Sequence, residues 1–115
     1  MTYDGSLVFL SVDDLELSSR FYRSLGLEVL VDQGSCHVLG EGDTMMVGLC
    51  GGRTPSPDGV IVTLVTRDVE RVCSRLESQG IRFEQPPRYN PEYRITHALL
   101  RDPDGYLVEI QRFET

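Results

Sequence analysis

Two short stretches decide the fold of this chain: VDDLE at residues 12–16 and TRDVE at residues 66–70. Asp68 lies 54 residues after Asp14 (68 − 14), and the alignment continues without a gap beyond the two stretches. In each copy an apolar segment leads into the aspartate, and a helix-like segment, a glycine and a second apolar segment follow. Because self-similarity at a fixed period marks a repeated structural unit, we interpret the chain as two copies of one unit.

Each copy is expected to begin with a strand and continue with a helix. Residues 6–12 and 60–66 are short, rich in β-branched residues and apolar at nearly every position, which is typical of strands buried on both faces. Asp14 and Asp68 suit helix N-caps, since a carboxylate there accepts a free backbone N–H and interacts favourably with the helix dipole. The repeat therefore predicts helices that begin directly after these aspartates.

Glycine is expected to end both helices, at Gly26 and Gly80, because it adopts the left-handed conformation common just after a helix. Three strand-like stretches follow each helix: 27–33, 35–40 and 44–50 in the first copy, and 81–85, 94–101 and 106–113 in the second, where Pro86-Pro87 and the DPDG turn at 102–105 separate them. The predicted fold class is α+β, with two tandem βαβββ modules. Module one covers about 5–50, residues 51–59 are a linker, and module two covers about 60–114, within a single domain of 1–115.

Composition excludes several partners. The 115 residues include 18 acidic and 11 basic side chains, and the net charge of −7 repels phosphate backbones and anionic lipid. No apolar run approaches the roughly 20 residues of a membrane-spanning helix, and no signal peptide is visible. The three cysteines, Cys36, Cys50 and Cys73, form no CxxC pair and are expected to be free thiols in a reducing cytoplasm. We therefore expect a cytoplasmic protein that binds neither nucleic acid nor membrane.

The chain resembles the vicinal oxygen chelate superfamily, which includes glyoxalase I, extradiol dioxygenases and bleomycin-resistance proteins. The resemblance rests on VDDLE at 12–16, FY at 21–22, LGL at 25–27 and the DPDG turn followed by Glu109, and it covers essentially the whole chain. It implies that the two modules pack side by side. Their sheets would then curl into an open cup with the helices on the outer face, and the protein would form a homodimer.

The same resemblance implies four metal-ligand positions, which fall on Leu7, Gly48, Ile61 (or its neighbour Val60) and Glu109. Leucine, glycine and isoleucine side chains offer no lone pairs, and one carboxylate alone does not hold a catalytic metal. We therefore expect no metal, no other cofactor, and no glyoxalase or dioxygenase activity of the usual kind. No serine-hydrolase, zinc-protease or nucleotide-binding motif is present.

If those positions point into the cup, strand alternation places their neighbours there too. The expected ligand-binding residues are Leu7, Phe9, Met46, Gly48, Ile61, Thr63, Tyr93, Arg94, His97 and Glu109. The alternative is that these side chains fill the cup and leave no cavity. His97 lies off the family's ligand positions. Tyr93 and Arg94 belong to the loop 88–94, whose two tyrosines and two arginines could clamp a planar or anionic ligand or simply decorate the surface.

Two functions follow. The first is a metal-free protein that sequesters or senses a small, partly apolar molecule. The second is a metal-independent enzyme, performing an isomerase or lyase-like step with Glu109 as its acid or base. A structural domain with a filled cup is a third possibility, and the identity of the ligand is not determined by the sequence.

Overall fold

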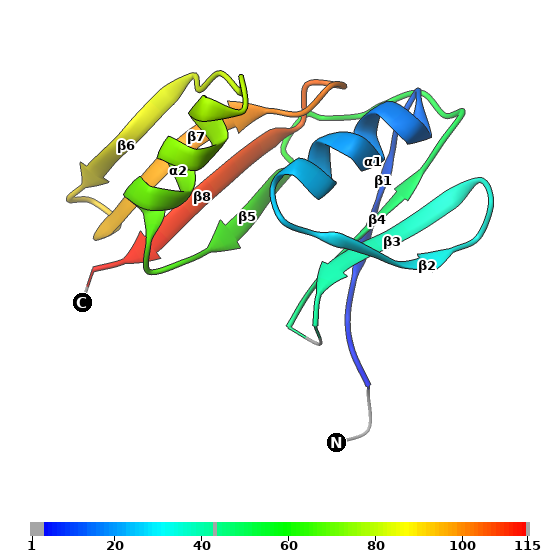
Figure 1. Cartoon of the computed structure of the whole chain (residues 1–115), viewed down its shortest axis with the longest axis horizontal. Helices are drawn as coiled ribbons and strands as arrows, with labels where there is room; N and C mark the ends of the chain where they lie inside the picture. Colours follow the sequence, from blue (N-terminus) through cyan, green and yellow to red (C-terminus); the bar gives the residue numbers. More distant parts are fainter. Residues whose placement is uncertain (1–3, 43, 115) are drawn as a thin grey trace. The chain divides into compact units, whose positions relative to one another are not determined.

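The computed structural model describes residues 4–42 and 44–114, and it divides the chain into two compact units, Met1–Ser56 and Pro57–Thr115. Each unit is a four-stranded mixed sheet with one helix packed on one face, as Figure 1 shows. The predicted α+β class with two tandem βαβββ modules is therefore confirmed. The single domain, the curling of the sheets into one cup and the exact module boundaries stay predictions.

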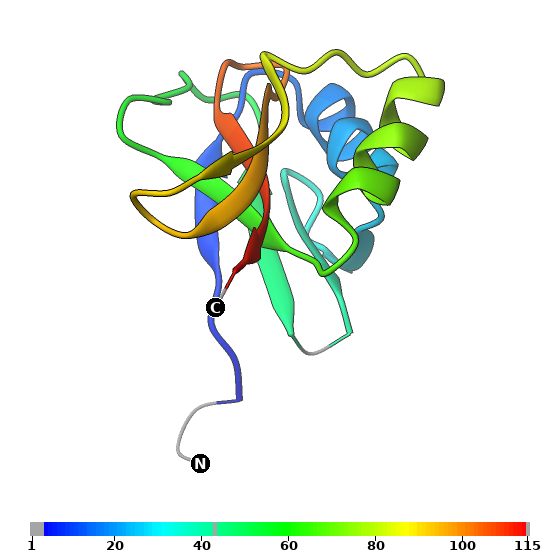
Figure 2. The ribbon, with the colours of Figure 1, turned by 90° about the vertical axis from the view of Figure 1, so that its left-hand side faces the viewer.

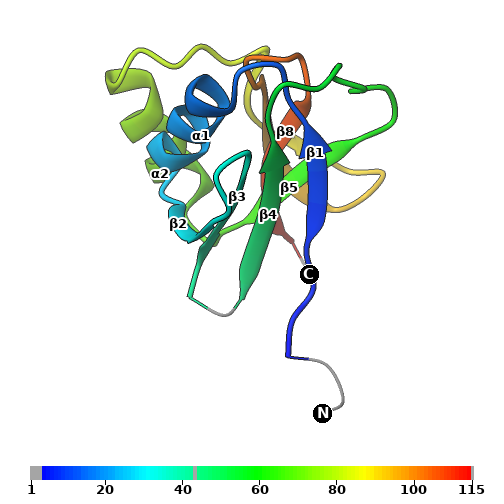
Figure 3. The same ribbon diagram turned by 90° about the vertical axis from the view of Figure 1, so that its right-hand side faces the viewer.

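The first unit contains β1 (Val8–Ser11), α1 (Leu15–Ser24), β2 (Glu28–Asp32), β3 (Cys36–Glu41) and β4 (Met45–Cys50). Its strand order is β1-β4-β3-β2, with β1 parallel to β4 and the other pairs antiparallel. α1 lies against one face of this sheet (Figure 3), where Tyr22 and Leu25 are buried.

The second unit repeats this order with β5 (Ile61–Val65), α2 (Val69–Ser78), β6 (Gln85–Asn90), β7 (Ile95–Arg101) and β8 (Leu107–Phe113). The strand order is β5-β8-β7-β6, again with one parallel pair, β5 with β8. α2 covers one face of the sheet (Figure 2) and buries Val69, Cys73 and Leu76 there, as the apolar spacing in the sequence predicts. The opposite face carries no helix of this unit and is called the open face below.

The predicted helix ends are confirmed, and both aspartates occupy the N-cap position, but only one of them makes the expected side-chain hydrogen bond. The Asp14 carboxylate accepts a hydrogen bond from the Leu17 backbone N–H at 3.1 Å, whereas the Asp68 side chain makes no capping hydrogen bond. Instead, the Asp68 backbone N–H donates to the Thr66 hydroxyl. This hydrogen bond closes a local turn over residues 66–68. Gly26 and Gly80 have φ values of 108° and 88°, the left-handed conformation expected after a helix.

The first strand after α2 lies further along than the sequence predicts. Residues 81–84 form no strand, and β6 instead contains Pro86 and Pro87, which were expected to interrupt the sheet. β6 is an edge strand, and its pairing with β7 shifts register between Gln85 and Arg88. An edge strand with a bulge tolerates proline because the missing N–H need not pair.

Two further expectations are wrong. β1 and β5 are not buried on both faces, since Val8 and Ile61 are 65% and 56% exposed; each lies at the edge of its sheet and has only one strand beside it. Cys36 and Cys50 are also not free thiols, because they form a disulfide between β3 and β4, while Cys73 is free and buried as expected. No helix among the described residues is long and apolar enough to cross a membrane.

Candidate functional site

The open face of the second sheet carries three polar side chains that contact one another. Thr63 and Glu109 are directly opposite in the parallel pair β5–β8, and the Thr63 hydroxyl donates to Glu109 Oε1 at 2.9 Å. His97 lies on β7, and its Nδ1 is 2.6 Å from Glu109 Oε2. The sequence predicted each of these residues at the site, and the structure joins them into one chain of hydrogen bonds.

The contact with Glu109 orients the histidine ring. An ionised carboxylate only accepts hydrogen bonds, so beside an ionised Glu109 the imidazole carries its proton on Nδ1. Nε2 makes no hydrogen bond within residues 4–42 and 44–114 and is the ring nitrogen left for a ligand. A histidine oriented in this way by a carboxylate can accept a proton from a bound molecule or donate one to it.

The surroundings of the group are apolar and partly open. The His97 and Glu109 side chains are 12% and 15% exposed, while Ile61 and Val65, on the same face of β5, are 56% and 55% exposed. A few convergent polar groups inside an apolar surface are typical of sites that bind small molecules. Ile61, which the sequence predicts to bind the ligand, thus lies on the same face as the hydrogen-bonded group, two residues before Thr63.

The remaining predicted residues of the second unit lie elsewhere. Tyr93 and Arg94 belong to the turn between β6 and β7, where Tyr93 is 67% exposed and Arg94 has a left-handed φ of 55°. The Arg94 carbonyl accepts the Glu114 backbone N–H, which ties this turn to the end of β8. Among the described residues no hydrogen bond or ion pair joins this turn to the His97–Glu109 pair, so a clamping role stays a prediction.

Four predicted residues lie in the first unit, and two of them are in contact. Phe9 on β1 is paired with Gly48 on β4, and a Cβ atom at position 48 would collide with the Phe9 ring. The glycine therefore provides the space in which this aromatic ring lies. Leu7 precedes β1, and Met46 lies on β4, two residues before Gly48 and on the same side of the strand.

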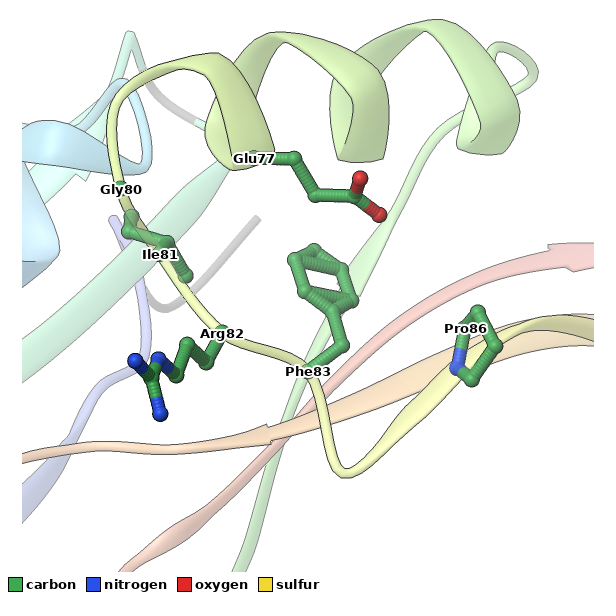
Figure 4. Close-up of a pocket in the computed structure, with 6 residues that line it drawn as sticks. All are labelled: Glu77, Gly80, Ile81, Arg82, Phe83 and Pro86. Atoms are coloured by element: carbon green, nitrogen blue, oxygen red, sulfur yellow. The ribbon is translucent and has the colours of Figure 1, made fainter.

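A shallow depression in the second unit was not predicted. It is lined by Glu77, Gly80, Ile81, Arg82, Phe83 and Pro86, from the end of α2 to the start of β6, and its volume is about 640 Å³. Figure 4 shows the Phe83 ring beneath the Glu77 carboxylate, with Arg82 pointing away from both. Since no set of polar groups converges in it, the depression is a weaker candidate than the Thr63–Glu109–His97 group.

The residues present do not fit a catalytic divalent metal. Three of the four positions implied by the resemblance carry leucine, glycine or isoleucine, and the fourth, Glu109, is held by His97 and Thr63. A catalytic zinc site uses three protein ligands, and no group of three His, Cys, Asp or Glu side chains able to hold a metal is found within the described residues.

Comparison with known proteins shows the family of this chain. Residues 6–110 match the model of the Glyoxalase/Bleomycin resistance protein/Dioxygenase superfamily, and the chain belongs to that family. It is 27% identical over 119 residues to the uncharacterized protein YraH of Bacillus subtilis, covering 90% of this chain and 93% of that protein.

Solved structures show the same fold. A glyoxalase/bleomycin resistance protein/dioxygenase from Nocardioides superimposes with a TM-score of 0.78 at 21% identity, covering 99% of this chain and 85% of that one. Lactoylglutathione lyase from Agrobacterium tumefaciens superimposes with a TM-score of 0.73 at 21% identity, covering 97% and 96% of the two chains. At these identities the likeness concerns the fold alone.

Proposed function

We propose that this protein binds a small, partly apolar molecule without a metal, and that it sequesters or senses this molecule. The observation that carries the proposal is the Thr63–Glu109–His97 group, which places a fixed imidazole within an exposed apolar face of the second sheet. A ligand would cover Ile61 and Val65 and hydrogen-bond to His97 Nε2. Burial of these apolar side chains would supply most of the affinity, and the imidazole would supply orientation.

The proposed protein is a homodimer, with Leu7, Phe9, Met46 and Gly48 of the first unit and Tyr93 and Arg94 of the second contributing further ligand contacts. Its partners would be the small molecule and a second copy of the chain, without nucleic acid or membrane. The proposed location is the cytoplasm, where thiols are kept reduced. The Cys36–Cys50 disulfide therefore gives a direct test of this location, in which alkylation in cells traps the two cysteines in their thiol or disulfide state.

The binding function is tested with a fragment library screened against ¹⁵N-labelled protein, with and without EDTA. We expect hits that shift the amide resonances of Thr63, His97 and Glu109 equally in both conditions. Ile61→Asp should abolish these shifts, and Leu17→Asp, which changes an exposed apolar residue on α1, should leave them unchanged. Hits that require a stoichiometric metal, measured by elemental analysis of the purified protein, would contradict the metal-free proposal.

The alternative function is a metal-independent isomerase or lyase-like enzyme. The 2.6 Å contact between His97 and Glu109 favours it, because such a pair can relay a proton between a substrate and the carboxylate. Glu109 would then be catalytic through this contact. Turnover of a bound compound would distinguish the enzyme from the binding protein, and Glu109→Gln should lower kcat with little change in binding. Normal turnover by Glu109→Gln would exclude this role.

A further inference from the structure

The open face of the second sheet can be mapped row by row from its strand register. One row runs across β6, β7, β8 and β5 through Arg88, His97, Gln111 and Val65, because each residue in this series pairs with the next. The next row runs through Gln85, Leu99, Glu109 and Thr63. Paired residues point to the same face, so Arg88 lies beside His97 at the polar centre of the face.

The two arginines of this face have different partners. Arg101 is 2.7 Å from the Glu84 carboxylate, whereas Arg88 donates through Nη2 to the amide oxygen of Gln85 at 2.8 Å. Gln85 in turn donates to the His97 carbonyl oxygen at 3.3 Å. Within the described residues Arg88 has no carboxylate partner, so its positive charge is held in place by a neutral amide and is not compensated.

This arrangement pre-organises the Arg88 guanidinium to bind an anion. A guanidinium whose orientation is fixed by a neighbouring amide loses less entropy on binding, and its planar donors match the two oxygens of a carboxylate. The Glu109 carboxylate, which lies two strands from Arg88 on the same face, and the net charge of −7 oppose a dianion such as a phosphate monoester. A single uncompensated guanidinium therefore favours a monoanion.

The spacing limits the rest of the ligand. Paired residues on neighbouring strands have Cβ atoms roughly 5 Å apart, so a group bound to Arg88 lies only a few bonds from a group bound to His97. His97 Nε2 would contact an oxygen close to the carboxylate, and the apolar remainder would lie on Leu99 and Val65. Beside an ionised Glu109, Nε2 of the neutral imidazole accepts a hydrogen bond, so a short acid with a hydroxyl group next to its carboxylate meets these requirements.

We propose that the ligand of this site is a small 2-hydroxy monocarboxylic acid with an apolar chain, whose carboxylate pairs with Arg88 and whose hydroxyl group donates a hydrogen bond to His97 Nε2. This inference rests on the proposed small-molecule function and adds the chemical class of the ligand. Arg88 belongs to the stretch 88–94, which the sequence indicated as a possible clamp for a planar or anionic ligand. Its place beside His97 was not indicated, because it depends on the bulged pairing of β6 with β7.

The test titrates ¹⁵N-labelled full-length protein with 2-hydroxy-3-methylbutanoate and 3-methyl-2-oxobutanoate, each beside its methyl ester, and with inorganic phosphate. We expect 2-hydroxy-3-methylbutanoate to shift the amides of Arg88, His97 and Gln111, and its ester to bind about 10- to 100-fold more weakly, the range of a charge-assisted hydrogen bond. The 2-oxo acid has no hydroxyl group to donate to Nε2 and should bind more weakly than the 2-hydroxy acid, so equal binding of the two acids would refute the hydroxyl contact. Arg88→Gln should weaken acid binding by a similar factor, and Arg88→Lys by less. Arg75→Gln, on α2, should change nothing.

The possible outcomes distinguish failure of this inference from failure of the proposed small-molecule binding on which it rests. If acids and esters bind equally to the open face, or if Arg88→Gln binds the acids normally, the carboxylate contact is refuted while the binding function stands. Shifts with phosphate alone would refute the monocarboxylate class. If neither the acids nor uncharged fragments shift resonances of this face, the proposed function fails as well.

Discussion

The Cys36–Cys50 disulfide should stabilise the fold, and its contribution can be worked out from its place in the sheet. The two cysteines are paired in the β3–β4 register, and Gly51 N–H donates to the Ser35 carbonyl just outside them at 2.9 Å. They therefore form a non-hydrogen-bonded pair, the closest approach of two antiparallel strands, with Cα atoms 4.1 Å apart.

The magnitude follows from the loop that the bond closes. The cysteines are separated by 14 positions, and closing a loop of this size removes chain entropy from the unfolded state worth about 3 kcal/mol at 25 °C. With a urea dependence of about 1.5 kcal/mol per molar for a chain of this length, the unfolding midpoint should fall by about 2 M on reduction.

The assay is urea unfolding followed by circular dichroism, with and without a phosphine reductant. The double variant Cys36→Ser/Cys50→Ser is the control, since the reductant should not move its midpoint. Three reactive thiols in urea-unfolded, unreduced protein would show that the bond is absent. Equal midpoints for oxidised and reduced wild-type protein would refute the entropic reasoning itself.

Three further outcomes are expected. Gly40→Ala should destabilise the first unit by about 1–3 kcal/mol in the same urea assay, because the added methyl group would collide with the Met45 carbonyl, which is backbone and cannot move aside; a wild-type midpoint would contradict this. The hydrogen bonds of Arg112 hold the pKa of the Glu70 carboxyl below its usual value, so their stabilisation is present at neutral pH and is lost as the pH falls below about 4.5. Arg112→Gln should accordingly destabilise the protein at pH 7 and have a smaller effect at pH 3, and an equal effect at both would be evidence against the ion pair. Burial raises the pKa of the Cys73 thiol to about 11, so iodoacetamide at pH 8 should leave it unmodified in folded protein and label it after unfolding, as mass spectrometry would show.

The sequence was sufficient for features that depend on local chemistry. The repeat, the Asp14 cap, the glycines that end both helices and the apolar stripe of α2 all follow from backbone preference and periodicity. The DPDG turn is of the same kind, since the Asp102 carboxylate accepts the backbone N–H groups of Asp104 and Tyr106 at 2.9 Å each.

Where pairing between strands competes with local preference, the sequence was misleading. Pro86 and Pro87 are strong turn residues, yet they lie within β6 because an edge strand with a bulge does not need their N–H groups. The spacing of Cys36 and Cys50 matches no local motif, so nothing short-range indicates that the β3–β4 register brings them together.

The candidate site also combines features that the sequence predicted with features that only the structure decided. The sequence by itself determined the family's fold pattern and, through strand alternation and the resemblance, placed Thr63, His97 and Glu109 among the ligand-binding residues. Only the tertiary structure decided that His97 contacts Glu109 diagonally across β7 and β8, and that Arg88 lies beside it. The reason is physical: alternation fixes the face on which a side chain lies, whereas its neighbours depend on strand order and register, which form between residues far apart in the chain.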